Sequence, residues 1–139
     1  TALHIKEMTL RGHAPKASYV VDAGINLLYT AAWFAISAHP ACRSDMLPEP
    51  ARLVGDLCME IDVIREDVQL PRLNIGDHLT LWPVGAYNLG ESMQFIHLRP
   101  EVVLVDVKGG VHIIRRKEEL VDVNTAELLP SYLAGGSDA

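Results

Sequence analysis

In this sequence, apolar side chains do not keep the 3.6-residue period of an amphipathic helix over any stretch longer than about 12 residues. Short apolar runs alternate instead with turn-forming residues. The run Ser18–Asp22 ends at the glycine Gly24, and His78–Trp82 alternates polar and apolar side chains, as a strand with one buried face does. The run Ala51–Gly55 also predicts a strand. These patterns favour a mainly β fold, either a sandwich or a small barrel, with short helices.

The clearest predicted element is a β-hairpin near the end of the chain. Two strand-like runs, Glu101–Asp106 and Val111–Arg116, are joined by Val107-Lys108-Gly109-Gly110. Glycine supplies the positive φ angles that a tight turn requires. No helix start with Lys or Ser follows the glycine pair, so it does not predict a phosphate-binding loop.

The composition is that of one globular domain. The chain has 139 residues, of which 49% are hydrophobic and 22% charged, enough to bury a single core. We expect one domain over residues 1–139, with residues 1–17 and 131–139 peripheral to it. A net charge of -6 with scattered basic residues offers no electrostatic reason to bind nucleic acid or an anionic membrane. Two cysteines and no signal peptide favour a cytoplasmic setting with free thiols.

One segment has the length of a membrane span. Ala23–Cys42 contains no charged side chain over 20 residues. Polar residues and Pro40 interrupt it, so we expect a buried strand that runs into a short helix. A turn-rich connection is predicted to follow over residues 39–51, because prolines recur there.

Two short segments carry a family resemblance. Gly55-Asp56-Leu57-Cys58-Met59-Glu60-Ile61-Asp62 is followed by Gly85-Ala86-Tyr87. This order resembles the Gly-x-x-Cys-x-x-x-Asp and Gly-Ala-Tyr segments in the second domain of diaminopimelate- and ornithine-type decarboxylases, the fold type III enzymes that use pyridoxal phosphate. Val21-Asp22-Ala23-Gly24 and Arg99-Pro100-Glu101-Val102-Val103-Leu104-Val105 resemble two further strands of that domain.

The resemblance implies a β-barrel-like C-terminal domain whose N-terminal α/β barrel is absent from this chain. In the family that barrel holds most of the pyridoxal phosphate, including the lysine that carries it. The resemblance therefore implies a homodimer in which this domain completes an active site for a small amino acid. By itself the chain is expected to be inactive.

Cys58 is the predicted catalytic residue. Loss of carbon dioxide leaves a carbanion, and a group must then protonate the former α-carbon. A thiol with a reference pKa near 8.5 stays protonated at neutral pH and can do so. From the residues alone, a buried packing cysteine would be the ordinary alternative.

Tyr87 and Asp62 are the other predicted site residues. The resemblance implies that Tyr87 donates a hydrogen bond to the cofactor phosphate across the dimer interface; a neutral phenol is a donor throughout the physiological pH range. It places Asp62 near the distal group of the substrate. A solvated turn residue is an equal alternative for Asp62. For Tyr87 the ordinary alternative is a half-buried aromatic whose hydroxyl reaches water.

Three positions depart from the family pattern. Thr30 stands where diaminopimelate-type enzymes carry an arginine that binds a substrate carboxylate. Met59 stands where the two types carry Glu or Asp, and Ala23 where ornithine-type enzymes carry Asp. The expected substrate is therefore neither diaminopimelate nor ornithine. The same departures motivate one alternative, a non-catalytic regulatory or assembly domain. A pyridoxal enzyme of another reaction type is a second alternative, because a fold does not fix the reaction.

No metal site is predicted. The six histidines are dispersed, and only His39-x-x-Cys42 has a ligand-like spacing. A structural zinc site usually needs two such pairs.

Overall fold

A computed structural model describes residues 2–10, 17–41 and 44–133. The chain divides into two compact units, Thr1–Ile96 and His97–Ala139. This division differs from the single domain that the composition led us to expect.

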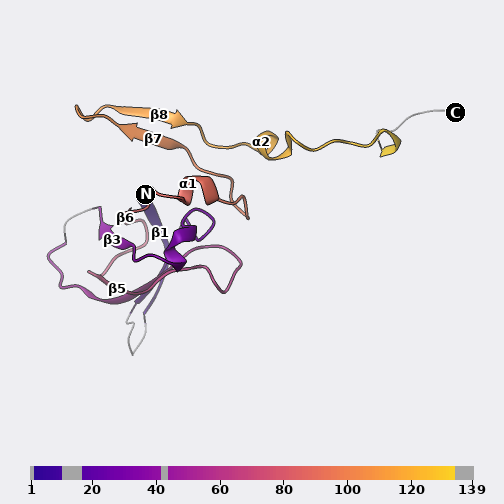
Figure 1. The fold of residues 1–139 in the computed structure, drawn as a ribbon. Coiled ribbons are helices and arrows are strands. Elements are labelled where there is room, and N and C mark those ends of the chain that lie inside the picture. Colours follow the sequence, from indigo (N-terminus) through magenta and orange to yellow (C-terminus); the bar gives the residue numbers. More distant parts are fainter. Residues whose placement is uncertain (1, 11–16, 42–43, 134–139) are drawn as a thin grey trace. The chain divides into compact units, whose positions relative to one another are not determined.

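The first unit is built on one six-stranded sheet with the order β3-β6-β1-β2-β4-β5. Its strands are β1 (Ala2–Leu10), β2 (Ala17–Val21), β3 (Ser37–Pro40), β4 (Glu49–Val54), β5 (Val63–Leu70) and β6 (His78–Trp82). Neighbouring strands are antiparallel except β2 and β4, which run parallel. The edge strands β3 and β5 also contact each other, so the sheet curls into a nearly closed barrel (Figure 1). The predicted mainly β fold is confirmed.

The first strand corrects one prediction. Residues 1–17 were expected to be peripheral, yet β1 pairs with β2 on one edge and with β6 on the other. Leu3 and Ile5 of β1 are fully buried. A strand with partners on both edges has its backbone groups satisfied and its alternate side chains turned into the core, so β1 is a central element of the barrel.

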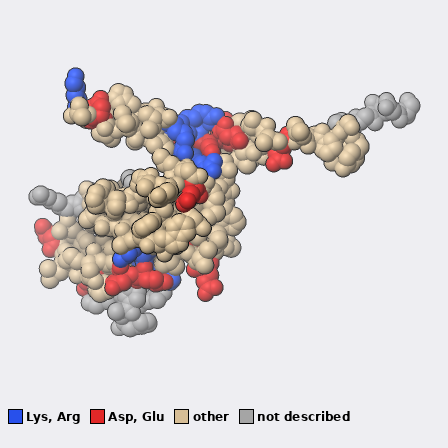
Figure 2. Space-filling model, viewed as in Figure 1, with Lys and Arg blue, Asp and Glu red and all other residues tan. Residues whose placement is uncertain are grey.

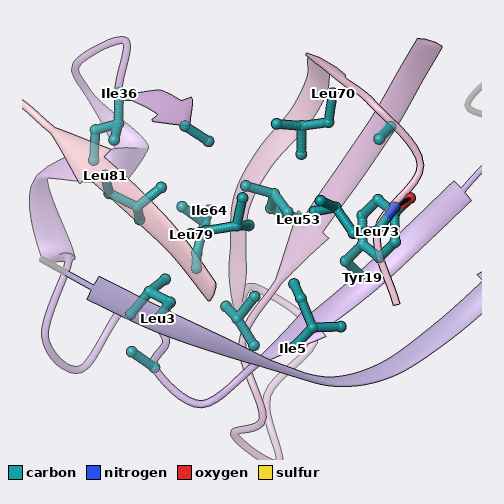
Figure 3. Packing of buried hydrophobic residues seen from close by; sticks show 14 of the residues in the cluster. Leu3, Ile5, Tyr19, Ile36, Leu53, Ile64, Leu70, Leu73, Leu79 and Leu81 are labelled. Atoms are coloured by element: carbon teal, nitrogen blue, oxygen red, sulfur yellow. Dashed lines mark hydrogen bonds between the residues drawn. The ribbon is translucent and has the colours of Figure 1, made fainter. Parts of the chain in front are cut away.

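The core fills the inside of the curled sheet (Figure 3). Strand β6 contributes Leu79 and Leu81, which are buried, while His78, Thr80 and Trp82 are exposed. This is the alternation that the sequence predicted for His78–Trp82. The large buried side chains labelled in Figure 3 come from most strands of the sheet and the loops beside it: Leu3, Ile5, Tyr19, Ile36, Leu53, Ile64, Leu70, Leu73, Leu79 and Leu81.

The predicted connection over residues 39–51 is partly wrong. Strand β3 extends to Pro40, and β4 already begins at Glu49. Proline is tolerated in β3 because this strand lies at the edge of the sheet, where an N–H is not needed. The segment Ala23–Cys42 was predicted as a buried strand that runs into a short helix. The short helix forms as the 3₁₀ helix η1 (Tyr29–Ala32), but the strand of this segment, β3, follows it rather than preceding it. No helix among the described residues is long and apolar enough to cross a membrane.

The second unit contains the predicted hairpin. Strands β7 (Val102–Val105) and β8 (Val111–Arg115) are antiparallel, and Gly109 in their turn has a φ of 84°. Helix α2 (Leu120–Asn124) and the 3₁₀ helix η2 (Ser131–Leu133) follow. Charged groups gather near the turn of the hairpin and at its open end, and the surface between them is mostly uncharged (Figure 2).

Candidate functional site

The predicted site residues lie on two loops of the first unit. Cys58 lies on the loop of residues 55–62 between β4 and β5, and Tyr87 lies just before the four-residue helix α1 (Asn88–Glu91). Both loops are hydrogen-bonded to the same stretch of chain, residues 24–30, which follows β2. The tertiary structure thus connects the two motifs through a third segment.

The 55–62 loop is closed by backbone hydrogen bonds and leaves Cys58 exposed. The Gly55 N–H donates to the Asp62 carbonyl at 3.0 Å, and the Asp62 N–H donates to the Met59 carbonyl at 3.1 Å. The Met59 N–H donates to the Leu57 carbonyl at 2.8 Å. Leu57 is buried, whereas Cys58 is an exposed free thiol. The loop therefore presents the thiol at its surface, and the expected alternative of a buried packing cysteine is wrong.

Asp62 lies on the inside of this loop with only 3% of its surface exposed. Its Oδ1 accepts the Ile25 N–H at 2.8 Å, and its Oδ2 accepts the Leu57 N–H at 2.9 Å. The alternative of a solvated turn residue is wrong. The predicted substrate contact remains a prediction, but burial and the two backbone donors favour a structural role for this carboxylate.

Two glycines make room for the Asp62 carboxylate. A Cβ atom on Gly24 would overlap the carboxylate oxygens, and so would a Cβ atom on Gly55. The Cβ of an alanine at position 55 would also come within 2.5 Å of the Gly24 Cα. Gly24 and Gly55 are therefore needed for close approach of two backbone segments around one side chain.

Tyr87 has a strained backbone and an exposed ring. Its φ is 65° and its ψ -40°, a region that a bulky non-glycine residue rarely adopts, and 67% of its surface is exposed. Such strain persists only where surrounding contacts enforce it, and it concentrates at functional sites.

Asn88 supplies those contacts. It is buried, its Oδ1 accepts both the Thr30 N–H at 3.1 Å and the Thr30 hydroxyl at 3.0 Å, and its Nδ2 donates to the Val84 carbonyl at 2.9 Å. The Met93 N–H donates to the Asn26 carbonyl at 2.9 Å on the other side of α1. The segment that carries Tyr87 is thus attached to residues 24–30 at two points.

The positions that depart from the family pattern are mostly buried. Ala23 and Thr30 expose 3% and 4% of their surfaces, and Met59 is half-buried. Thr30 is engaged with Asn88 rather than turned to the surface. Sequence reasoning missed Asn88 and the role of Gly24, because no local pattern shows that a residue will bond to one 58 positions away.

The described residues contain no group of three or more His, Cys, Asp or Glu side chains that could hold a metal ion. Cys42, the second member of the His39-x-x-Cys42 pair, lies outside the described residues. Two carboxyl groups of the second unit have a lowered pKa: that of Asp106 is lowered mainly by His112, and that of Asp122 mainly by Arg116.

The comparisons with known proteins agree with this geometry. The family model described as the pyridoxal-dependent decarboxylase, C-terminal sheet domain, matches residues 2–85, a stretch that includes β1, Cys58 and Asp62 and ends just before Tyr87. The match covers more than half of the chain, so the chain belongs to this family. The resemblance seen in the sequence is confirmed.

The chain is similar to diaminopimelate decarboxylases from several organisms. It is 31% identical over 133 residues to the enzyme of Methanocaldococcus jannaschii. The aligned residues cover 94% of this chain and 29% of that relative. It is 33% identical over 131 residues to the enzyme of Archaeoglobus fulgidus. The aligned residues cover 88% of this chain and 31% of that relative.

Solved structures show the same fold. The crystal structure of diaminopimelate decarboxylase from M. jannaschii superposes with a TM-score of 0.81 at 24% identity, covering 95% of this chain and 30% of that one. Another diaminopimelate decarboxylase structure gives a TM-score of 0.78 at 28% identity, covering 92% of this chain and 33% of that one. The chain thus spans about a third or less of the length of these proteins.

Proposed function

We propose that this chain is the C-terminal domain of a pyridoxal-phosphate-dependent amino acid decarboxylase and completes the active site of a dimer. One observation carries this proposal. An exposed thiol, Cys58, and an exposed, conformationally strained phenol, Tyr87, lie on two loops attached to the same segment in a member of the decarboxylase family.

Tyr87 and Cys58 could form part of a site for pyridoxal phosphate. Tyr87 offers an exposed neutral donor for a phosphate, and Cys58 offers an exposed thiol. Two cavities among the described residues, of about 400 and 340 Å³, are lined by other residues. The exposed positions of Tyr87 and Cys58 therefore support a domain that contacts a cofactor bound mainly by another domain, the α/β barrel implied by the resemblance.

When bound, pyridoxal phosphate would supply an electron sink for the charge that remains on the α-carbon once carbon dioxide has left. Cys58 would then deliver a proton to the former α-carbon, a role for which a positioned acid is typically worth about 10²- to 10⁴-fold in rate. Tyr87 would donate its phenolic hydrogen to the phosphate. Both loops are fixed to residues 24–30, so the two groups would enter a partner subunit's site together.

The partners follow from the share of the relatives that the chain spans. With about 70% of each relative unmatched, we propose an N-terminal α/β barrel and a homodimer as the active assembly, with a cytoplasmic location in keeping with the free thiol. The substrate would be a small amino acid. Buried Thr30, already bonded to Asn88, supports a substrate other than diaminopimelate, because it cannot form the carboxylate contact of an arginine.

The test is carbon dioxide release by the complete protein with pyridoxal phosphate and a panel of amino acids. We expect decarboxylation of at least one, a loss of about 10²- to 10⁴-fold in kcat for Cys58→Ala, and weaker binding of pyridoxal phosphate for Tyr87→Phe. Glu60→Gln, a change at an exposed position in the same loop as Cys58, is the control. Failure to decarboxylate any amino acid would contradict the proposal and support the non-catalytic alternative.

A further inference from the structure

We infer that Asp62 is the positioning residue for Cys58: its buried side chain holds the cysteine loop against the segment that follows β2. This inference rests on the proposed function only for the role of Cys58. In place of the substrate contact predicted for Asp62, it assigns to Asp62 the task of holding the loop that carries Cys58.

The hydrogen bonds of Asp62 enclose Cys58 on both sides. Its carboxylate accepts the N–H of Leu57, the residue before Cys58, and its own N–H donates to the carbonyl of Met59, the residue after it. Its carbonyl accepts the Gly55 N–H at the base of the loop. Of the described residues in the loop, only Cys58 and its neighbours Glu60 and Ile61 are exposed. The thiol is thus placed by bonds made at the residues beside it.

The second carboxylate oxygen attaches this loop to the rest of the barrel. Oδ1 accepts the Ile25 N–H at 2.8 Å, so one side chain joins the segments that follow β2 and β4, two strands that run parallel in the sheet. Hydrogen bonds to a carboxylate are about twice as strong as those between neutral groups. Gly24 and Gly55 leave the space that this arrangement needs.

An amide in place of the carboxylate cannot reproduce these contacts. Asparagine has one acceptor oxygen, and its amino group would face a backbone N–H, which is also a donor. Asp62→Asn therefore keeps the shape of the side chain but loses either the Leu57 or the Ile25 contact. Glu60→Gln is the matched control, because it removes the same charge from an exposed position two residues away in the same loop.

The first experiment is amide hydrogen exchange on the 139-residue chain without cofactor. We expect the Leu57 and Ile25 amides to be protected in the unaltered chain. Asp62→Asn should raise the exchange rate of at least one of them by about tenfold or more, which corresponds to the loss of a charge-assisted hydrogen bond. The exchange rate of the Leu79 amide in β6 should not change. Glu60→Gln should change none of these rates. An unprotected Leu57 amide in the unaltered chain would overturn the inference even if the variant does not fold.

The second experiment is a double-mutant cycle in the complete protein. Asp62→Asn should lower kcat by about 10- to 100-fold, the effect of misplacing a reacting group, with KM and cofactor affinity unchanged. In a Cys58→Ala background it should cause no further loss, because the two changes act on one step. An equal loss in both backgrounds, or a loss confined to KM, would overturn the positioning role. A protein with no decarboxylase activity would contradict the proposed function, while the exchange experiment would still decide the role of Asp62.

Discussion

The carboxylate of Asp62 accepts the backbone N–H of Ile25 at 2.8 Å although 37 positions separate the two residues in the sequence. This hydrogen bond explains why the Val21-Asp22-Ala23-Gly24 and Gly55–Asp62 motifs occur together. Each supplies a glycine whose missing side chain lets the other segment approach. The motifs are parts of one structural unit rather than two separate binding elements.

The first prediction concerns these glycines. Gly24→Ala and Gly55→Ala should each lower the free energy of unfolding by about 2 kcal/mol or more, because the new Cβ must displace the buried Asp62 carboxylate or strain the backbone. Urea unfolding measures the loss. Gly85→Ala is the control, since a Cβ there meets nothing within 4 Å. Equal stability of all three variants would show that Asp62 moves aside without cost.

The second prediction concerns Asn88. Asn88→Ala leaves the Thr30 hydroxyl and the Val84 carbonyl without their partner, so it should cost about 2–3 kcal/mol in unfolding free energy. Thr30→Val removes one donor and should cost about 1 kcal/mol. Leu89→Ala, at an exposed position in the same helix, is the control and should stay within about 0.5 kcal/mol of the unaltered chain. A loss in Asn88→Ala no larger than in the control would contradict the assigned contacts.

The third prediction tests the burial pattern of β6. Leu79→Ala removes a fully buried side chain and should cost about 2–5 kcal/mol. Thr80→Ala, the next residue on the opposite face, should change stability by less than about 0.5 kcal/mol. Thermal unfolding of both variants is the measurement. The reverse order would mean that the register of β6 is shifted by one residue.

The fourth prediction concerns pH. Arg116 forms two hydrogen bonds of 2.6 Å to Asp122 and lowers the pKa of that carboxyl to about 2 from its ordinary value of 3.8. Because the folded pKa lies below the unfolded one, this pair stabilises the second unit fully above about pH 4. The contribution is lost as pH falls through the folded pKa.

An NMR titration of the Asp122 carboxyl measures this pKa directly. We expect a midpoint near 2 in the unaltered chain and a return toward 3.8 in Arg116→Gln. Lys117→Gln removes the same charge one residue along the chain and should leave the midpoint in place. A normal midpoint in the unaltered chain would show that the pair does not persist in solution.

Local patterns predicted several strands well. Two apolar runs and a turn glycine were enough to predict the hairpin, and the alternation of polar and apolar side chains was enough to predict β6. The structure confirms both elements. Strand β1 was missed because its place in the sheet is decided by partners that lie far from it in the sequence, β6 above all. Helix α2 begins at Leu120, because the side chains of Glu119 and Asp122 form a capping box there.

In the candidate site, too, the sequence could identify some residues and not others. Cys58, Asp62 and Tyr87 could be selected from the order of their motifs, and the exposure of Cys58 and Tyr87 agrees with a site at the surface. The contribution of Asn88 could not be selected. Its side chain is adjacent to Thr30 only because α1 packs beside η1 in the folded chain.

By itself, then, the sequence determined the mainly β class, the family and the residue types that could act on a substrate, because strand period, turn glycines and short motifs are local properties. Only the tertiary structure decided that Asp62 faces inward while Cys58 faces outward on the same loop. A buried carboxylate is stable only where backbone donors converge on it, and those of Ile25 and Leu57 meet at Asp62 only once β2 and β4 lie side by side.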